Sequence, residues 1–100
     1  MNTLEMKLHQ TLASLGDNAE EVAAFLLGQG CKGHKNSRSS CPVATYLHRM
    51  FDVHYVNVSG KNAFIAHGLH MAASIPMPES IQGFVELFDA GHFPELVESR

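Results

Sequence analysis

The spacing of apolar residues changes twice along this chain, and these changes limit the folds that it can adopt. In most of the chain up to residue 51, apart from residues 29–40, and again after residue 78, apolar side chains recur every three or four residues, as they do on one face of a helix. Between these regions, residues 53–58 are rich in the β-branched and aromatic side chains that favour a strand. The sequence therefore predicts a helix-rich α+β domain with the element order α-α-α-β-β-α.

Three helices are predicted before the strand region. The first carries a leucine stripe and ends at Gly16, and the second begins with the acidic residues that follow Asp17. The third begins at Ser40 or Cys41, with Pro42 in its first turn. The predicted buried positions of the three helices are Leu4, Leu8, Leu12 and Leu15; Val22, Phe25, Leu26 and Gln29; and Val43, Leu47, Met50 and Phe51.

One antiparallel hairpin and a last helix are predicted after residue 52. A turn at residues 59–62 joins the first strand to a second strand at residues 63–67, and a short third strand between Leu69 and Ile75 is left open. Pro78 opens the last helix, and Phe93 and Leu96 are expected to fold back onto the core. The predicted buried positions of the last helix are Ile81, Phe84, Val85 and Phe88.

The length of 100 residues fits one hydrophobic core, so residues 1–100 are expected to form a single domain. No apolar run approaches the roughly 18 residues of a membrane span, and no membrane partner is expected. The first seven residues lack the pattern of a signal peptide, and two cysteines are too few for a disulfide scaffold. We therefore expect a cytoplasmic protein with both thiols reduced.

The segment before the third helix is the strongest candidate for a binding site. Residues 29–40 contain glycines and serines without apolar periodicity, and no acidic residue lies between Glu21 and Asp52. The start of a helix also attracts anions through its free N–H groups and its dipole. The residues expected to contact an anion or a partner are Lys32, Lys35, Arg38, Ser39, Ser40 and Arg49. The C-terminal fifth is acidic, and the two charged segments either lie on opposite sides of the fold or meet within it.

Two alternatives follow from the same region. In a winged-helix arrangement, loop 31–40 and the third helix would bind nucleic acid, with Thr45, His48 and Arg49 facing the major groove, and residues 53–67 would form the wing. Against this hypothesis, about twelve residues join the second and third helices, whereas a helix-turn-helix uses three or four. The second alternative is a metal- or thiol-dependent site at Cys31, His34 and Cys41, because Cys and His are the ligands that zinc prefers.

No motif of a hydrolase or of a cofactor-binding fold is present, so we expect neither catalysis nor a cofactor. Because these classes are excluded, we expect a small non-catalytic adaptor or regulatory protein that binds another macromolecule. A protein partner is expected, with nucleic acid as the alternative, and the oligomeric state is left open.

Two segments carry a resemblance to a protein group. Residues 41–47 are Cys-Pro-Val-Ala-Thr-Tyr-Leu, and residues 84–96 have the pattern Phe-Val-x-x-Phe-Asp-Ala-Gly-x-Phe-Pro-x-Leu. In both, the chain resembles a group of small uncharacterised proteins of actinobacteria and their phages, over roughly residues 20 to 97. The group has no established activity, so the resemblance implies a bacterial or phage cytoplasmic setting and no catalytic residue.

Overall fold

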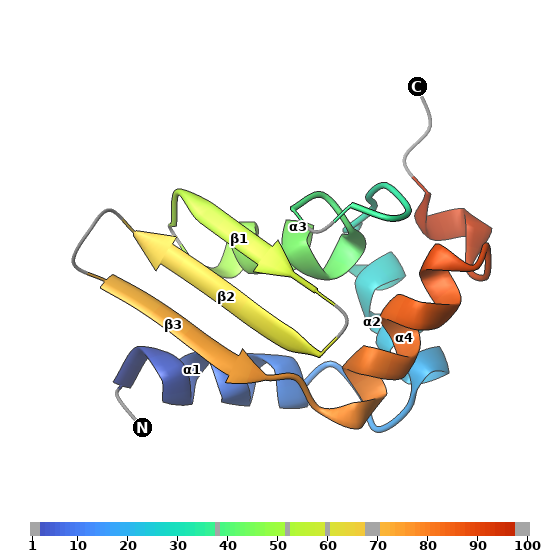
Figure 1. Ribbon diagram of the computed structural model, residues 1–100. Helices are drawn as coiled ribbons and strands as arrows, with labels where there is room; N and C mark the ends of the chain where they lie inside the picture. Colours follow the sequence, from blue (N-terminus) through green and yellow to red (C-terminus); the bar gives the residue numbers. More distant parts are fainter. Residues whose placement is uncertain (1–2, 38, 52, 60, 68–70, 98–100) are drawn as a thin grey trace.

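The computed structural model describes residues 3–37, 39–51, 53–59, 61–67 and 71–97. These residues form four α-helices, a three-stranded antiparallel sheet and a short 3-10 helix (Figure 1). The predicted α+β class is confirmed, and the third strand that the sequence left open is present. The elements are α1 (Thr3–Ala13), α2 (Ala19–Gly28), α3 (Pro42–Met50), β1 (Tyr55–Val58), β2 (Asn62–His67), β3 (Met71–Pro76), α4 (Glu79–Asp89) and η1 (Pro94–Leu96).

The sheet is a meander with the strand order β1-β2-β3. Its register is continuous: Asn57 lies opposite Phe64, and Phe64 lies opposite Ser74. Successive side chains of a strand point to opposite faces. The inward-facing set is buried and consists of Val56, Val58, Ala63, Ile65, Ala73 and Ile75.

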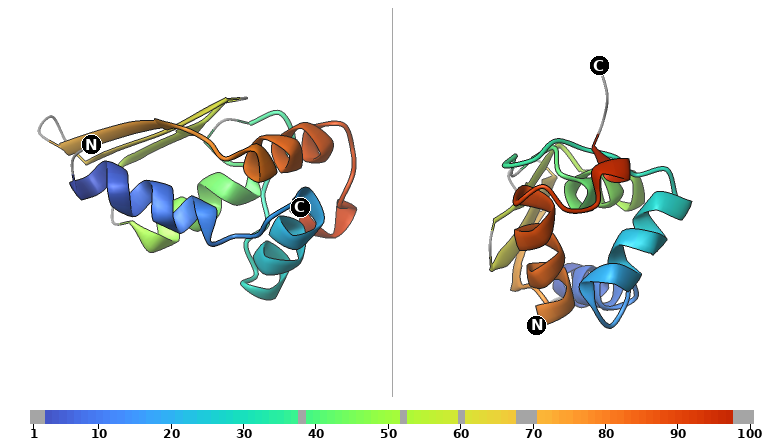
Figure 2. Two further views of the ribbon diagram at one scale, coloured as in Figure 1. Left: turned by 90° about the horizontal axis from the view of Figure 1, so that it is seen from below. Right: turned by 90° about the vertical axis from the view of Figure 1, so that its right-hand side faces the viewer.

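The described helices leave one face of the sheet uncovered. Figure 2 shows α1 and α3 on the same side of the sheet, with α2 and α4 beyond the end at which β3 leads into α4. α1 packs against β3, α3 packs against β1, and α2 packs against α4. The molecule therefore has a helical layer, a sheet and an open outer face.

Local signals in the sequence explain where the helices begin. At α2, the side-chain oxygen of Asn18 accepts a hydrogen bond of 2.9 Å from the Glu21 N–H, and the Glu21 carboxylate accepts one of 2.8 Å from the Asp17 N–H. The first bond satisfies an N–H group that the helix start leaves free, and the second ties the residue before the N-cap to the first turn. At α3, Cys41 is the N-cap and Pro42 occupies the first turn, as predicted.

The core joins the helical stripes to the inner face of the sheet. Leu8, Leu12, Val22, Leu26 and Leu47 are fully buried, which confirms the central positions of the first three predicted stripes. The predicted positions of the last helix are buried as well, namely Ile81, Phe84, Val85 and Phe88. The prediction that the tail folds back is also confirmed, because Leu96 is fully buried and the ring of Phe93 stacks on Phe84 at a centroid distance of 5.5 Å.

Two predicted core positions are wrong. Gln29 is exposed because α2 ends at Gly28 and Gln29 forms its C-cap. Met50 is 55% exposed. It occupies the last turn of α3, where it and Phe51 border an open hollow against Lys7 and Thr11 of α1. Helical periodicity predicted the side of α3 on which Met50 lies, but no described element covers that turn.

Candidate functional site

Backbone hydrogen bonds hold the predicted basic loop against the rest of the fold. The Gly33 N–H donates to the Leu96 carbonyl at 2.9 Å, and the His34 N–H donates to the Ser40 carbonyl at 2.8 Å. Further along, the Asn36 N–H donates to the Asp89 carboxylate at 2.8 Å. The loop therefore lies between the C-terminal segment, the start of α3 and the end of α4.

The structure places the residues predicted to bind an anion in different environments. Lys32, Lys35 and Ser39 are exposed, and Ser40 is half-buried with its carbonyl bonded to His34. Arg49 is held at the first residue of segment 29–40, because its Nη1 donates to the carbonyl of Gln29 at 2.6 Å. Arg38 lies outside the described residues. Arg49 thus satisfies a carbonyl at the end of α2, where a cation interacts favourably with the helix dipole.

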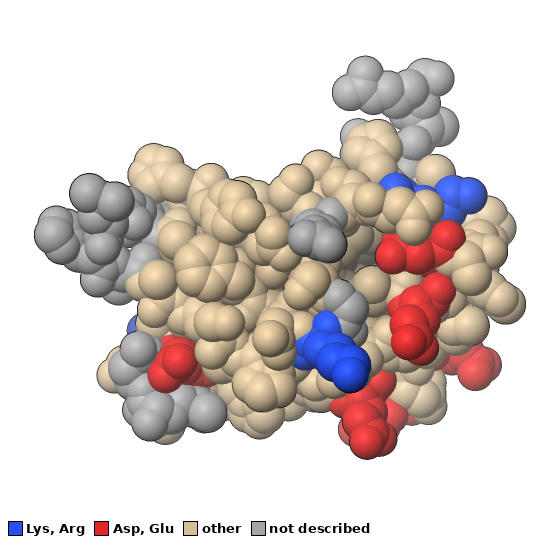
Figure 3. All heavy atoms as spheres, viewed as in Figure 1, with Lys and Arg blue, Asp and Glu red and all other residues tan. Residues whose placement is uncertain are grey.

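The two charged segments of the sequence meet within the fold. Figure 3 shows cationic and acidic side chains next to each other at the end of the molecule where α4 lies. A cavity of about 240 Å³ at this end is bordered by the loop, by the Cys41 thiol and by the carboxylates of Glu86 and Asp89. These carboxylates face the same space as the start of α3, so the electrostatic environment there opposes an anion.

Burial makes the Cys41 thiol a weak acid. It raises the pKa of Cys41 from 9.0 to about 11, although backbone N–H groups of Ala44 and Val43 lower it, and the nearby Asp89 carboxylate raises it further. The thiol is therefore protonated at neutral pH, whereas reactive cysteines are partly ionised. Burial raises the pKa of Cys31 too, despite the opposing effect of Arg49.

The metal alternative finds no ligand cluster among the described residues. Cys31 and Cys41 are both free and buried, and no described group of three or more His, Cys, Asp or Glu side chains could hold an ion. The sequence also contains two histidines at a similar spacing, His67 and His70, whose side chains lie outside the part of the chain that is described.

The hairpin is not a projecting wing. β2 pairs with β1 on one side and with β3 on the other, so it is the central strand of the sheet. Thr45, which a winged helix would aim at a base, donates its hydroxyl to the Lys32 carbonyl at 3.1 Å. These two features do not match the geometry that the winged-helix hypothesis requires.

The outer face of the sheet is a feature that the sequence did not indicate. Two rows of side chains cross it from β1 to β3, and Asn62 and Pro76 extend it on β2 and β3; none of these described side chains is charged. The set consists of Tyr55, Asn57, Asn62, Phe64, Ala66, Ala72, Ser74 and Pro76. In Figure 3, which views this face, charged side chains flank the sheet and uncharged atoms cover most of it.

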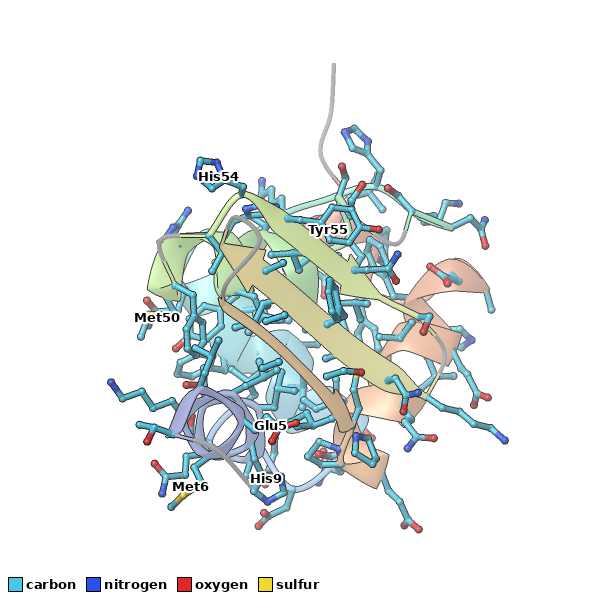
Figure 4. All side chains as sticks on the ribbon, turned by 60° about the vertical axis from the view of Figure 1, so that its left-hand side comes forward. Glu5, Met6, His9, Met50, His54 and Tyr55 are labelled. Atoms are coloured by element: carbon cyan, nitrogen blue, oxygen red, sulfur yellow. The ribbon has the colours of Figure 1, made fainter. Side chains whose placement is uncertain are left out.

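An aromatic pair lies in the middle of this face. The rings of Tyr55 and Phe64 meet edge to face at a centroid distance of 5.7 Å, as diagonal neighbours on adjacent strands can. The Asn57 amide donates to the Tyr55 hydroxyl at 3.0 Å and fixes its position. Tyr55 is nevertheless 48% exposed. Two other exposed large apolar residues are labelled in Figure 4, Met6 and Met50; they lie on the helical side and do not extend this face.

The signal that could have revealed this face is a run of uncharged residues at every second position of the strands. A strand with one solvated face commonly places polar or charged residues at every second position. Here the alternate positions of β2 and β3 hold Phe64, Ala66, Ala72 and Ser74. The sequence could have flagged this pattern only if the third strand had been predicted with its register.

Among the described residues, no helix has the length and apolar character needed to cross a membrane.

No protein-family model matches the chain, and neither curated proteins nor solved structures show significant similarity to it. The resemblance to small proteins of actinobacteria and their phages therefore stays a prediction from residues 41–47 and 84–96.

Proposed function

We propose that the protein is a small, non-catalytic, cytoplasmic adaptor or regulatory protein that binds another protein through the outer face of its sheet. The observation that carries the proposal is the uncharged, aromatic-centred face formed by β1, β2 and β3. The two free thiols support the cytoplasmic part of the proposal, because cytoplasmic cysteines are kept reduced.

The chemistry of this face resembles the centre of a protein interface. Such centres are depleted of charged side chains and enriched in aromatic ones. Tyr55 and Phe64 provide aromatic surface, and the small side chains of Ala66 and Ala72 beside them allow a partner to approach the sheet closely. Tyrosines in well-packed interface centres often contribute more than their neighbours to binding.

Nucleic acid is the less favoured partner. Affinity for nucleic acid comes largely from cationic contacts to phosphates, and no lysine or arginine lies among the described residues of the outer face. Lys32 and Lys35 lie on the loop, whose Asn36 is bonded to the Asp89 carboxylate. The aromatic pair alone would supply stacking without the electrostatic part of the affinity.

Capture of partners from a lysate, with and without nuclease, tests the proposal. The tagged protein is compared with Tyr55→Lys, which places a charge on the outer face. Leu27→Lys is the matched control, because Leu27 is exposed to a similar degree, 43%, but lies on α2. We expect a discrete protein that survives nuclease and is lost only with Tyr55→Lys, provided that circular dichroism shows all three proteins folded.

Other outcomes would overturn the proposal. Equal loss with both variants would show that the outer face is not the binding surface. Recovery of nucleic acid, with binding that falls steeply as salt increases and is lost on Lys35→Ala, would instead favour the loop as a nucleic-acid site.

A further inference from the structure

β3 is an edge strand, and the sheet register defines which of its backbone groups are unpaired. The Met77 N–H donates to the Lys61 carbonyl at 2.8 Å, so Lys61 and Met77 form a hydrogen-bonded pair. In an antiparallel ladder, hydrogen-bonded pairs recur at every second residue. Ile75 and Ala73 therefore bond to β2, and the N–H and C=O groups of Ala72 and Ser74 point away from it. No hydrogen bond outside the sheet joins these groups to the described residues.

The sequence of this edge lacks the features that keep edge strands apart. Natural edges commonly carry lysine, an inward charge, a bulge or an internal proline. Residues 71–76 contain no charged side chain, their register with β2 has no bulge, and Pro76 is the last residue of the strand. The other edge, β1, has only four residues. The sheet has two edges at which another strand could pair, and the β3 edge is the longer one.

We propose that two copies of the chain associate by antiparallel pairing of their β3 strands about a two-fold axis at Ala73. In this arrangement Ala72 exchanges both backbone hydrogen bonds with Ser74 of the other copy, and Ser74 does the same with the other Ala72. The same surface is used by both copies, which closes the assembly at a dimer. The result is a continuous sheet in which β3 is no longer an edge.

A second copy fits this edge because the pattern is self-complementary. Each copy offers a donor and an acceptor at Ala72 and again at Ser74, two residues apart, and these positions match under the two-fold rotation. The facing side chains are small and uncharged, so no like charges are brought together. α1 packs against β3 on the inner side, so the outer face stays free in the dimer.

The size of the outer face supports the same arrangement, and this step rests on the proposed function. From standard strand dimensions, one face of about 14 by 20 Å covers roughly 280 Å². A stable interface takes about 800 Å² from each partner. Pairing through β3 would place two outer faces side by side and would roughly double the continuous surface offered to a partner protein.

Sedimentation equilibrium of the whole chain tests the dimer. Pairing through one strand buries a small area, so we expect reversible dimerisation between about 10 µM and 1 mM, as for weak interfaces below about 1,200 Å². Ser74→Lys should raise the dissociation constant at least tenfold. Asn57→Lys is the matched control, because Asn57 lies in the same row of the outer face but on β1, and it should leave dimerisation unchanged.

A second measurement reports on the hydrogen bonds themselves. The Ala72 and Ser74 amides should become protected from hydrogen exchange as the concentration rises, and Ser74→Pro should abolish dimerisation while leaving the bonds of β3 to β2 intact, because the replaced N–H points outward. A monomer at every concentration, or equal weakening by Asn57→Lys, would overturn the proposal. If the dimer forms but Tyr55→Lys still captures its partner, only the proposed function fails.

Discussion

Gly33 lies where the loop crosses the start of α3, and its replacement by alanine tests that close approach. A Cβ at this position would collide with the Ser40 carbonyl oxygen, and it would lie 2.6 Å from the Cys41 carbonyl carbon and 2.7 Å from the Pro42 nitrogen. Carbon atoms in favourable contact are separated by about 3.5–4.0 Å. All three neighbours are backbone atoms, so no side-chain rotation relieves the overlap.

The cost of Gly33→Ala follows from two effects. Forcing an extra carbon into a packed region costs about 1–3 kcal/mol. Moving the loop outward also breaks the bonds from Gly33 N–H to Leu96 and from His34 N–H to Ser40, which contribute about 1 kcal/mol each. We therefore expect the free energy of unfolding to fall by about 3–5 kcal/mol, a large part of the 5–15 kcal/mol typical of a domain.

Urea unfolding followed by circular dichroism measures this loss, and Gly83→Ala is its matched control. Gly83 lies within α4, and a Cβ there meets no atom within 4 Å. The control should gain about 0.5–1 kcal/mol, because alanine favours a helix over glycine. If Gly33→Ala unfolds within about 0.5 kcal/mol of the natural chain, the loop does not lie against α3 as described and the reasoning is refuted.

Three further substitutions probe other parts of the fold. Burial raises the pKa of Cys41 from 9.0 to about 11, so the unfolded chain loses the thiol proton first as pH rises, and up to about 2.7 kcal/mol of stability should be lost between pH 9 and 11. In unfolding curves measured over this pH range, Cys41→Ser should lose less stability than the natural chain. Equal losses would contradict the burial of the thiol. Phe88→Ala should cost about 3–5 kcal/mol in urea unfolding, because Phe88 is fully buried, and a loss below about 1 kcal/mol would contradict its place in the core. Arg49→Ala should lower the free energy of unfolding by about 1 kcal/mol, because it removes the bond to the Gln29 carbonyl. Arg49→Lys should retain part of this stabilisation. An unchanged unfolding curve for Arg49→Ala would show that Arg49 does not stabilise the end of α2.

Local patterns were sufficient to predict the helices. In α4, the spacing of Ile81, Phe84, Val85 and Phe88 matches the helical repeat, and all four are buried. At α3, the capping position and the proline in the first turn define where the helix begins. These signals act over a few residues, so they can be recognised without knowledge of the tertiary structure.

The third strand depends on contacts that local propensity does not express. Residues 71–76 contain two alanines, a serine and a terminal proline, which are weak strand formers. They form a strand because pairing with β2 satisfies the backbone groups of Ala73 and Ile75 and buries these two side chains against the helices. Without that register, the row of uncharged side chains across the outer face could not be recognised.

The surroundings of the basic loop could not be predicted from the sequence either. Asn36 and Asp89 are 53 residues apart in sequence, yet the N–H of one donates to the carboxylate of the other. The sequence left open whether the charged segments meet, and only the packing of α4 beside the loop decides it. A cluster of cations in a sequence therefore predicts an anion site only when the acidic residues elsewhere in the chain are known to lie apart from it.

The open face of the sheet depends on where α4 packs, and the sequence of α4 cannot determine that position. An amphipathic helix can bury its apolar stripe against either a sheet or another helix, because burial of apolar surface is non-directional. Had α4 crossed back over β1, β2 and β3, the sheet would have been covered on both faces. Instead α4 packs against α2 beyond the end of the sheet (Figures 1 and 2). Tyr55 consequently remains exposed to solvent and Phe64 is only partly buried. The fold of a single chain does not explain why the described residues around this pair are uncharged, whereas the proposed protein partner would.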